Sequence, residues 1–279
     1  MVTPKDICFM ITTAGTPCYV HLNIEMIRKF HPKATILVVN DKQSEDGIKD
    51  VSSLYEDCYY FESDSFKLMN YDNRHFQGET SIVEKGIKEA KRLGFKYVVK
   101  LSRRVIPNTE ILTGLCDLIN KSDALVVSNY TDTRQQTEDC LYIFGFPIRT
   151  EIMCLNVDML YDNLDTLNRL CDCSNGQPRP FNGMMAEAWF WEITFNEVVE
   201  ELLSKYATDK LKGYLNCQSS YIDSPFYAPT IVVWKGLVTP DRNGKCDQLI
   251  THWTYSNEYY YELSKQFNLP YTSTDFNLK

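Results

Sequence analysis

Four short apolar runs in this sequence each end in polar side chains that could contact a ligand. The polar segments are, in chain order, Thr12-Thr13-Ala14-Gly15, Asn40-Asp41, Ser102-Arg103-Arg104 and Ser128-Asn129-Tyr130. Arginine stays charged and binds phosphate oxygens through two parallel hydrogen bonds. An aspartate that closes a strand, such as Asp41, suits a ribose hydroxyl or a base edge; the alternative is that it only caps a following turn. Together these residue types favour a site for a phosphate-bearing ligand.

The segment after the first apolar run argues against two common nucleotide sites. Residues 12–17 have neither the glycine spacing of a dinucleotide-binding loop nor the Walker pattern. We therefore do not expect an NAD or ATP site built on a glycine-rich loop.

Strand and helix patterns alternate through the first half of the chain, and these elements must position the polar segments. The expected strands are Ile7–Ile11, Ile36–Val39, Tyr59–Phe61, Tyr97–Leu101 and Ala124–Val127. The expected helices are Val20–Phe30, Glu79–Leu93 with Gly94 as its C-cap, and Ile111–Ile119. This alternation predicts an α/β fold with a mostly parallel sheet flanked by helices. In such a sheet, ligands bind beyond the carboxyl ends of the strands.

The second half of the chain is more aromatic, and its elements are harder to read. We expect strands at Leu141–Phe146 and Ile231–Trp234, helices at Met159–Leu170 and Ala186–Leu203, and a tail rich in Tyr and Asn. Neither an internal repeat nor a Gly/Ser linker interrupts the sequence. A single continuous domain over residues 1–279 is therefore expected.

Composition excludes several classes of protein. The chain has 279 residues and a net charge of −8, and no cluster of Lys and Arg, which argues against nucleic-acid binding. It contains no apolar segment of the ~20 residues that a bilayer requires, so no transmembrane segment is expected. The N-terminus does not read as a secretory signal, which predicts a cytoplasmic protein whose ten cysteines are reduced and mostly buried. Cys171 and Cys173 lack a second pair, so structural zinc is not favoured.

The order of the expected elements resembles that of GT-A nucleotide-sugar glycosyltransferases, which have a single Rossmann-like domain. Three stretches are also similar to the WavE family of bacterial surface-polysaccharide enzymes. Gln77–Ala90, with its Ser/Thr cluster and Gly86, precedes an aromatic strand in which Lys100 lies near the end. Asp139 leads an aromatic strand into Gly145, and Met185–Trp189 places Glu187 near the start of a helix.

The resemblance implies a function and a set of donor-side residues. It implies transfer of a hexosyl or deoxyhexosyl group from a nucleotide-sugar donor to a glycan acceptor, with residues 1–130 as the nucleotide-binding half and 131–279 as the acceptor-side half and C-terminal tail. The donor-binding candidates, by strand-end position and by resemblance, are Thr12, Thr13, Asp41, Arg74, Gln77, Lys100, Ser102 and His252. For His252, the alternative is a hydrogen-bonded core residue beside aromatics.

One departure from the families concerns the metal. Such enzymes usually carry an acidic motif after the Lys-ended strand, whose carboxylates hold a divalent cation against the diphosphate. Here no carboxylate occurs between Glu89 and Glu110. We hypothesise that Arg103 or Arg104, with Lys100, neutralises the diphosphate instead, and that only one of the two arginines faces the ligand. The alternatives are a solvated surface pair or an inactive site. No cofactor is predicted, although Mn²⁺ or Mg²⁺ stays an alternative.

The catalytic base and the acceptor site are expected in the second half. Glu187 is the first candidate to deprotonate an acceptor hydroxyl during inverting transfer, with Asp139 and Asp158 as weaker candidates. The alternative for Glu187 is a carboxylate that only interacts with its helix dipole. Tyr130, Asp139 and Trp189 are the acceptor candidates, because aromatic faces suit the C–H surface of a sugar ring. Core packing is the alternative for the tryptophan.

Two other functions stay open at this point. A catalytically inactive member of the same fold would only bind a glycan or a nucleotide, and the arginines favour that interpretation. A sugar-phosphate nucleotidyltransferase is disfavoured because the first loop lacks a glycine-rich, basic signature. The sequence does not indicate the donor, the acceptor or the oligomeric state.

Overall fold

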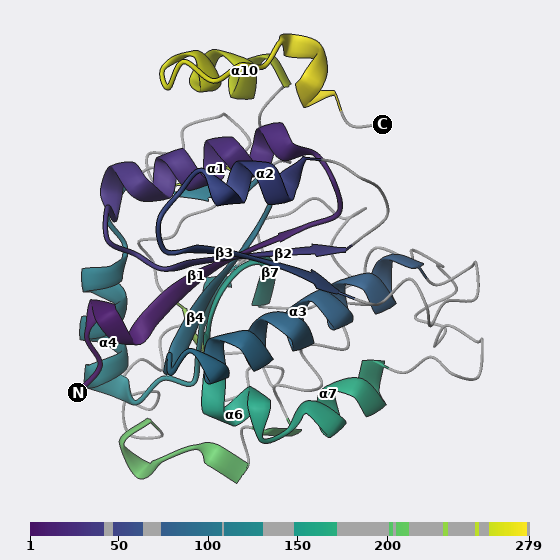
Figure 1. Cartoon of the computed structure of the whole chain (residues 1–279). Coiled ribbons are helices and arrows are strands. Elements are labelled where there is room, and N and C mark those ends of the chain that lie inside the picture. The colour runs from purple at the N-terminus through teal and green to yellow at the C-terminus, as the bar shows by residue number, and fades with distance from the viewer. Residues whose placement is uncertain are drawn as a thin grey trace, which may run out of the picture.

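The computed structural model describes most of the first half of the chain and parts of the second. The described residues are 1–41, 47–63, 74–107, 109–130, 148–171, 201–202, 205–211, 231–233, 249–250 and 257–277. Within them, seven strands form one sheet with helices on both faces (Figure 1). The expected α/β fold with a mostly parallel sheet is confirmed.

The sheet has the strand order β3-β2-β1-β4-β7-β6-β8. Its strands are β1 (Ile7–Thr13), β2 (Ile36–Asp41), β3 (Cys58–Ser63), β4 (Tyr97–Ser102), β6 (Val126–Tyr130), β7 (Ile148–Asn156) and β8 (Ile231–Val233). Only β7 runs against its neighbours, being antiparallel to both β4 and β6. The other six strands therefore share one direction, and their carboxyl ends meet at one edge. A separate two-stranded sheet pairs β5 (Ile106–Pro107) with β9 (Leu249–Ile250).

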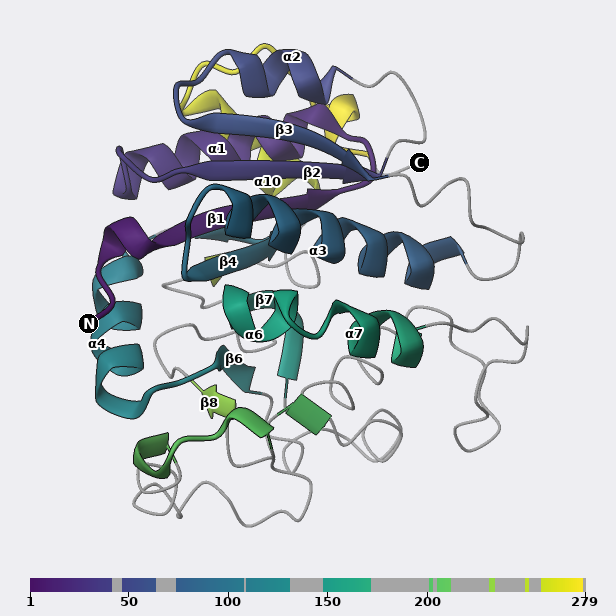
Figure 2. The ribbon, with the colours of Figure 1, turned by 60° about the horizontal axis from the view of Figure 1, so that its bottom comes forward.

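Helices cover both faces of the sheet (Figures 1 and 2). On one face lie α1 (Pro17–Phe30) and α2 (Ile48–Ser53); on the other lie α3 (Arg74–Arg92), α6 (Val157–Tyr161) and α7 (Leu164–Cys171). Along β1, Phe9 and Ile11 pack toward the α1 side, whereas Cys8 and Met10 pack toward the α3 side. Because both faces are covered, the strand is apolar along its length rather than alternating.

The C-terminal segment forms an additional layer outside α1. It contains α10 (Asn257–Lys265) and the 3₁₀ helix η6 (Ser273–Phe276), and it lies across the outer side of α1 in Figure 1. One side of α1 packs on the sheet through Val20 and Ile24, and the other packs on the segment through Tyr19 and Leu22. This explains why α1 is apolar around most of its circumference.

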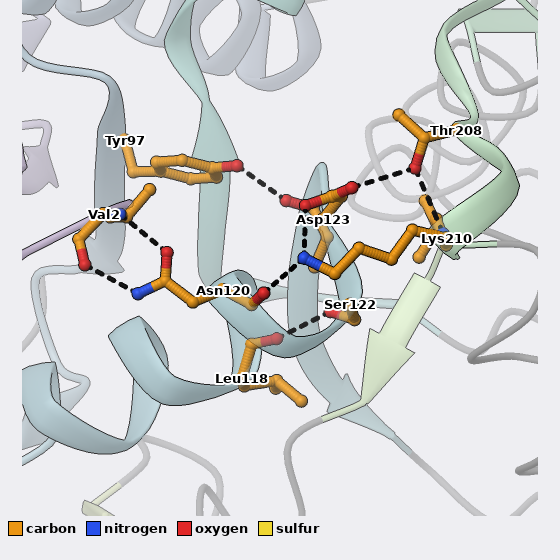
Figure 3. A network of polar contacts seen from close by, with 10 residues as sticks. Val2, Tyr97, Leu118, Asn120, Ser122, Asp123, Thr208 and Lys210 are labelled. Atoms are coloured by element: carbon orange, nitrogen blue, oxygen red, sulfur yellow. Dashed lines mark hydrogen bonds and ion pairs between the residues drawn. The ribbon is translucent and has the colours of Figure 1, made fainter.

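The C-terminal end of α4 (Leu112–Ser122) joins the N-terminus to a later segment of the chain (Figure 3). Asn120 exchanges two hydrogen bonds with the backbone of Val2, at 2.6 and 2.8 Å. Asp123 ends the helix in the left-handed conformation, with φ 55°, and accepts hydrogen bonds from Lys210 at 2.9 Å and Thr208 at 3.2 Å. Segments more than 80 residues apart are thereby held together.

A buried histidine contacts the other end of α4, and its protonation should make stability pH-dependent. Burial lowers the pKa of His31 from its ordinary 6.5 despite the neighbouring Glu110, and its Nε2 accepts from Ile111 N–H at 3.3 Å. Below pH 6.5 the unfolded chain binds a proton that the native ring resists, so stability should fall as pH falls. Urea unfolding should show that the free energy of unfolding falls less between pH 7 and pH 5.5 in His31→Gln than in the unsubstituted protein. An equal fall in both would contradict the assignment of this pH dependence to His31.

Helix α3 approaches the sheet closely at Gly86, which lies over β1. A Cβ placed there would lie 1.9 Å from Sδ of Met10, whose side chain is fully buried. Gly86→Ala should therefore cost about 1–3 kcal/mol of stability by overpacking, although alanine is the better helix former. The exposed Lys88→Ala in the same helix should change stability by only about 0.5 kcal/mol. Thermal unfolding compares the two, and equal effects would refute the close approach.

Several elements differ from expectation. The helix expected over Met159–Leu170 is two helices, α6 and α7, and the strand expected from Ala124 begins at Val126. Strand β7, helices α2 and α10, and the β5–β9 pair were not expected. Of the two expected elements Leu141–Phe146 and Ala186–Leu203, the first lies outside the described residues and the second is described only at residues 201–202.

The described part of the chain bears on two further expectations: that the cysteines are reduced and mostly buried, and that no segment spans a membrane. Five of its cysteines, namely Cys8, Cys18, Cys58, Cys116 and Cys154, are free, and all of these except Cys58 are buried. Burial raises the pKa of Cys18 to about 12 and of Cys116 to about 11, so both are protonated and unreactive at neutral pH. Among the same residues, no helix combines the length and apolar character that spanning a bilayer demands.

Candidate functional site

The carboxyl ends of the central strands bring the predicted polar segments together at one edge. Thr12 of β1 lies between Val39 of β2 and Ser102 of β4, and Thr13 lies beside Asn40. The end of β4 continues directly into Arg103 and Arg104. The first three of the four predicted segments are therefore neighbours in space.

The loop between β1 and α1 turns through two successive left-handed residues. Gly15 has φ 80° and Thr16 has φ 74°. Thr13 Oγ1 donates to the Gly15 carbonyl at 2.6 Å, and Gly15 N–H donates to Asn40 Oδ1 at 3.1 Å. These bonds hold the loop against the edge of the sheet immediately before the first turn of α1.

Arg103 bridges the two central strands. Its N–H donates to the Thr12 carbonyl at 3.0 Å, and its Nη1 donates to the Ala14 carbonyl at 2.7 Å. Burial, and then the positive charge of Arg104, lower the pKa of Arg103 from its ordinary value. The contribution of Arg104 to this shift, which is second to burial, means that the two positive charges are close enough to repel each other.

Arg104 lies against two buried tyrosine rings that contact each other. Its guanidinium carbon is 5.3 Å from the ring centroid of Tyr19 and 5.1 Å from that of Tyr260. The two rings contact each other edge to face, with centroids 5.0 Å apart. Tyr19 belongs to the first turn of α1 and Tyr260 to α10, so the guanidinium stands beside the N-terminal end of α1.

Residues 102–105, which we name the arginine loop, are held from outside by side chains. The amide of Asn23 donates to the carbonyls of Val105 at 2.9 Å and Arg103 at 3.5 Å. The hydroxyl of Tyr260 donates to the Arg104 carbonyl at 2.9 Å. Three consecutive carbonyls of the arginine loop are thus held by side chains of α1 and α10.

Positive electrostatic potential is concentrated where the arginine loop meets α1. The first turn of α1 has no acidic residue, and its N-cap, Thr16, forms no side-chain capping hydrogen bond. A helix N-terminus carries a partial positive charge, so the two guanidinium groups stand beside a third positive element. This arrangement disfavours cations and favours an anion with several oxygens.

Lys100 lies on the other face of the sheet from α1. Its ammonium forms an ion pair with Glu79 of α3, and it donates to Ser102 Oγ at 3.3 Å. The side chain of Lys100 is 1% exposed and that of Glu79 is 25% exposed. The charge of Lys100 is therefore balanced by a carboxylate of α3.

The remaining donor-side candidates that the structure describes are buried and hydrogen-bonded near the edge. Thr12 Oγ1 donates to the Leu101 carbonyl at 3.4 Å. Asp41 accepts from Ser63 of β3 at 3.4 Å and is 3% exposed. These contacts place Asp41 between β2 and β3 at the carboxyl end of both strands.

Other predicted residues can be placed only by their backbone, or not at all. Arg74 and Gln77 lie in the first turns of α3, which begins on the side where β1, β2 and β3 end (Figure 2). Tyr130 ends β6 at the same edge. Asp139, Glu187, Trp189 and His252 lie outside the described residues. Strand β9 ends two residues before His252 and pairs with β5, which follows the arginine loop.

Asp158, a weaker candidate for the base, lies at the wrong end of the sheet. Because β7 is antiparallel, its last residue, Asn156, pairs with Tyr97 at the start of β4. Asp158 follows in α6 and forms an ion pair with Lys91 near the C-terminal end of α3. It is therefore at the edge opposite to the arginines.

The residues at the end of β4 do not fit a divalent cation. Mn²⁺ and Mg²⁺ bind carboxylate and other oxygen ligands, whereas this strand end presents a hydroxyl followed by two guanidinium groups. Across the part of the chain that the structure describes, no group of three or more His, Cys, Asp or Glu side chains could hold a metal ion.

Sequence reasoning missed the residues that support the arginines. Nothing in the sequence singles out Asn23, Tyr19 or Tyr260, and Glu79 stands there only within the motif that resembles the WavE family. A tyrosine within a helix resembles ordinary core, and no sequence signal links residue 260 to residue 104. The one available hint is the apolar character of α1 around most of its circumference, which implies that something covers its outer side.

Comparison with known proteins identifies the fold. No protein-family model and no curated protein matches this sequence. The structure of an active-site mutant of LgtC is similar with a TM-score of 0.52 and 12% identity, covering 96% of this chain and 100% of that one. LgtC, named a galactosyltransferase in its complex with donor and acceptor sugar analogues, gives 0.44 at 13% identity, covering 95% and 97%. Residues 1–349 of TarS from S. aureus give 0.44 at 14%, covering 97% and 68%.

These matches differ in what they support. The first, with a TM-score above 0.5, confirms the expected GT-A-like fold, a single α/β Rossmann-like domain. At 12% identity, similarity of structure establishes the fold alone. The finer resemblance to the WavE family finds no matching family model.

Proposed function

We propose that this protein is a glycosyltransferase that moves a sugar from a nucleoside-diphosphate donor to a glycan acceptor. The observation that carries the proposal is the pair of arginines at the carboxyl edge of a GT-A-like sheet, beside the first turn of α1. In an open α/β sheet this edge is where ligands bind. Residues 1–130 would bind the nucleotide, and residues 131–279 would form the acceptor side and the tail.

The chemistry of the leaving group explains why two arginines suit this position. As the glycosidic bond to the donor breaks, negative charge develops on the departing diphosphate, and fixed positive groups lower the energy of that state. The positive charge of Arg104 is, after burial, the second cause of the lowered pKa of Arg103, so the two guanidinium groups would repel each other without a ligand. An anion between them relieves that repulsion. The resulting stabilisation is largest in the transition state, where the leaving group carries most negative charge.

Transfer without a divalent metal follows from the same arrangement. The guanidinium groups stand where related enzymes usually hold carboxylates, and they would supply the positive charge that the cation supplies there. Thr12, Thr13 and Ser102 are the donor-side residues nearest to them in the sheet, and Asp41 ends the next strand, β2. Arg74, Gln77 and His252 complete the proposed donor set.

The acceptor side of the proposal rests on sequence. Glu187 would act as the base that deprotonates the attacking hydroxyl during inverting transfer. Tyr130, Asp139 and Trp189 would contact the acceptor. The resemblance to the WavE family favours an acceptor that belongs to a bacterial surface polysaccharide. Glu187→Gln should abolish turnover and leave donor binding intact.

A thermal-shift screen of nucleotide sugars tests the proposal. UDP-, GDP- and dTDP-linked sugars should include at least one that raises the melting temperature in EDTA, because only a ligand of the folded state stabilises it. CMP-linked sugars carry a single phosphate and serve as the matched control. The donor that binds should then release free nucleoside diphosphate when acceptor glycans are supplied. Binding without release would favour an inactive binding protein, and no binding would refute the proposal.

A further inference from the structure

The C-terminal segment contributes the most specific contacts to the arginine loop, although it lies more than 150 residues away in sequence. Tyr260 contacts Arg104 twice: its hydroxyl donates to the backbone carbonyl, and its ring lies against the guanidinium. Tyr19 provides a second ring beside it, and its own hydroxyl donates to the Phe276 carbonyl at 2.7 Å. Both tyrosines are fully buried. The guanidinium of Arg104 therefore lies against a pair of touching rings, one from the segment and one from α1.

Two features indicate that this arrangement does more than fill the core. A guanidinium is hydrated in water, and packing it against two buried rings restricts its orientation, which gives a defined direction to its hydrogen bonds. The same ring that restricts the side chain also holds the backbone carbonyl of the same residue.

We propose that Tyr260, together with Tyr19, is a positioning residue that orients the guanidinium of Arg104 toward the leaving diphosphate. The inference rests on the proposed function and deepens it: the C-terminal segment, 257–277, becomes part of the donor site. Neither tyrosine touches the reacting atoms. They act through Arg104. Because they already fix its side chain, the anion does not have to bear the entropy cost of ordering it on binding.

Tyr271 offers a matched control within the same segment. It packs against Phe276 and His21, with its hydroxyl 3.1 Å from His21 Nδ1, so its contacts are with the segment itself and with α1 rather than with the arginine loop. Its replacement should loosen the segment on α1 to an extent similar to that of Tyr260. A general loss of packing would therefore affect both variants alike.

The test uses inorganic pyrophosphate, titrated calorimetrically into the full chain in EDTA. Tyr260→Leu should raise the dissociation constant about tenfold, because the cation–π contact and the hydroxyl are both lost. Tyr260→Phe, which keeps the ring, should raise it about two- to threefold. Tyr271→Leu should leave it within twofold. Unchanged affinity in Tyr260→Leu, or an equal loss in Tyr271→Leu, would overturn the inference.

A spectroscopic readout separates this inference from the proposed function. The Nε–H resonance of Arg104, assigned by its disappearance in Arg104→Lys, should be sharp in the unsubstituted protein and in Tyr271→Leu, and averaged in Tyr260→Leu. If the unsubstituted protein binds no pyrophosphate, the proposed function fails, and the resonance alone then decides whether Tyr260 positions the guanidinium. A resonance unchanged by Tyr260→Leu would show that it does not.

Discussion

Replacing Arg103 by Gln should lower kcat/KM for the nucleotide-sugar donor by about 10²–10³-fold, the usual cost of removing one group that stabilises developing negative charge. Arg104→Gln should cost a similar factor. If both guanidinium groups bind one anion, rather than only one of them facing the ligand as the sequence predicts, their effects should not add in the double variant. Arg104→Lys keeps the charge but loses the planar fork, and an intermediate loss is expected.

Stability provides the internal control for this prediction. Burial, and then the positive charge of Arg104, disfavour the charged form of Arg103, so removal of the Arg103 charge should leave thermal stability without ligand nearly unchanged. Arg92, which is 61% exposed on α3, is the matched arginine away from the site, and Arg92→Gln should retain full activity. Steady-state release of nucleoside diphosphate measures all variants. Full activity in Arg103→Gln and Arg104→Gln would exclude the proposed role of both residues.

Removing the carboxylate that balances Lys100 should have the largest effect on stability. Glu79→Gln leaves a buried ammonium without its carboxylate, and breaking such a pair costs about 3 kcal/mol. Lys100→Met should cost less, because Glu79 is partly exposed and water can solvate its carboxylate. The double variant Glu79→Gln/Lys100→Met should be more stable than Glu79→Gln alone. Urea unfolding measures the free energy of unfolding of the unsubstituted protein, the two single variants and the double variant.

The same helix supplies a control for this prediction. Glu84 pairs with Lys88 at the surface, and the lysine is about half exposed. Glu84→Gln should therefore cost only about 0.5 kcal/mol. If Glu79→Gln costs no more than Glu84→Gln, the buried ion pair does not contribute as described.

The first half of the fold could be predicted because local signals there agree with the tertiary structure. Runs such as Ile7–Ile11 and Ile36–Val39 are apolar enough to mark strands covered on both faces, and both are observed within β1 and β2. Gly94 ends its helix in the left-handed conformation, with φ 85°, as its position predicted. The strand-end segments then follow from the alternation of strand and helix.

Elements that depend on distant contacts could not be predicted. Strand β7 contains Ile152–Leu155, with Met153 and Cys154, which have weaker strand preference than β-branched residues, and only its neighbours β4 and β6 select the strand. The placement of α10 on α1 depends on contacts such as Tyr19 with Tyr260, which no local pattern reveals.

The candidate site shows the same division. The sequence alone located Arg103, Arg104 and Ser102 at a strand end, because a strand end is a local feature. It did not show which groups surround each side chain. Lys100 was grouped with the arginines by sequence, yet the structure pairs it with Glu79 on the opposite face of the sheet.

Dependence of turnover on a divalent metal tests the central claim most directly. The protein should be dialysed against EDTA and assayed for release of nucleoside diphosphate from its donor, before and after addition of MnCl₂. If arginines neutralise the leaving group, the rate in EDTA should stay within about twofold of the rate in manganese. Activity that disappears in EDTA and returns with manganese would contradict the claim.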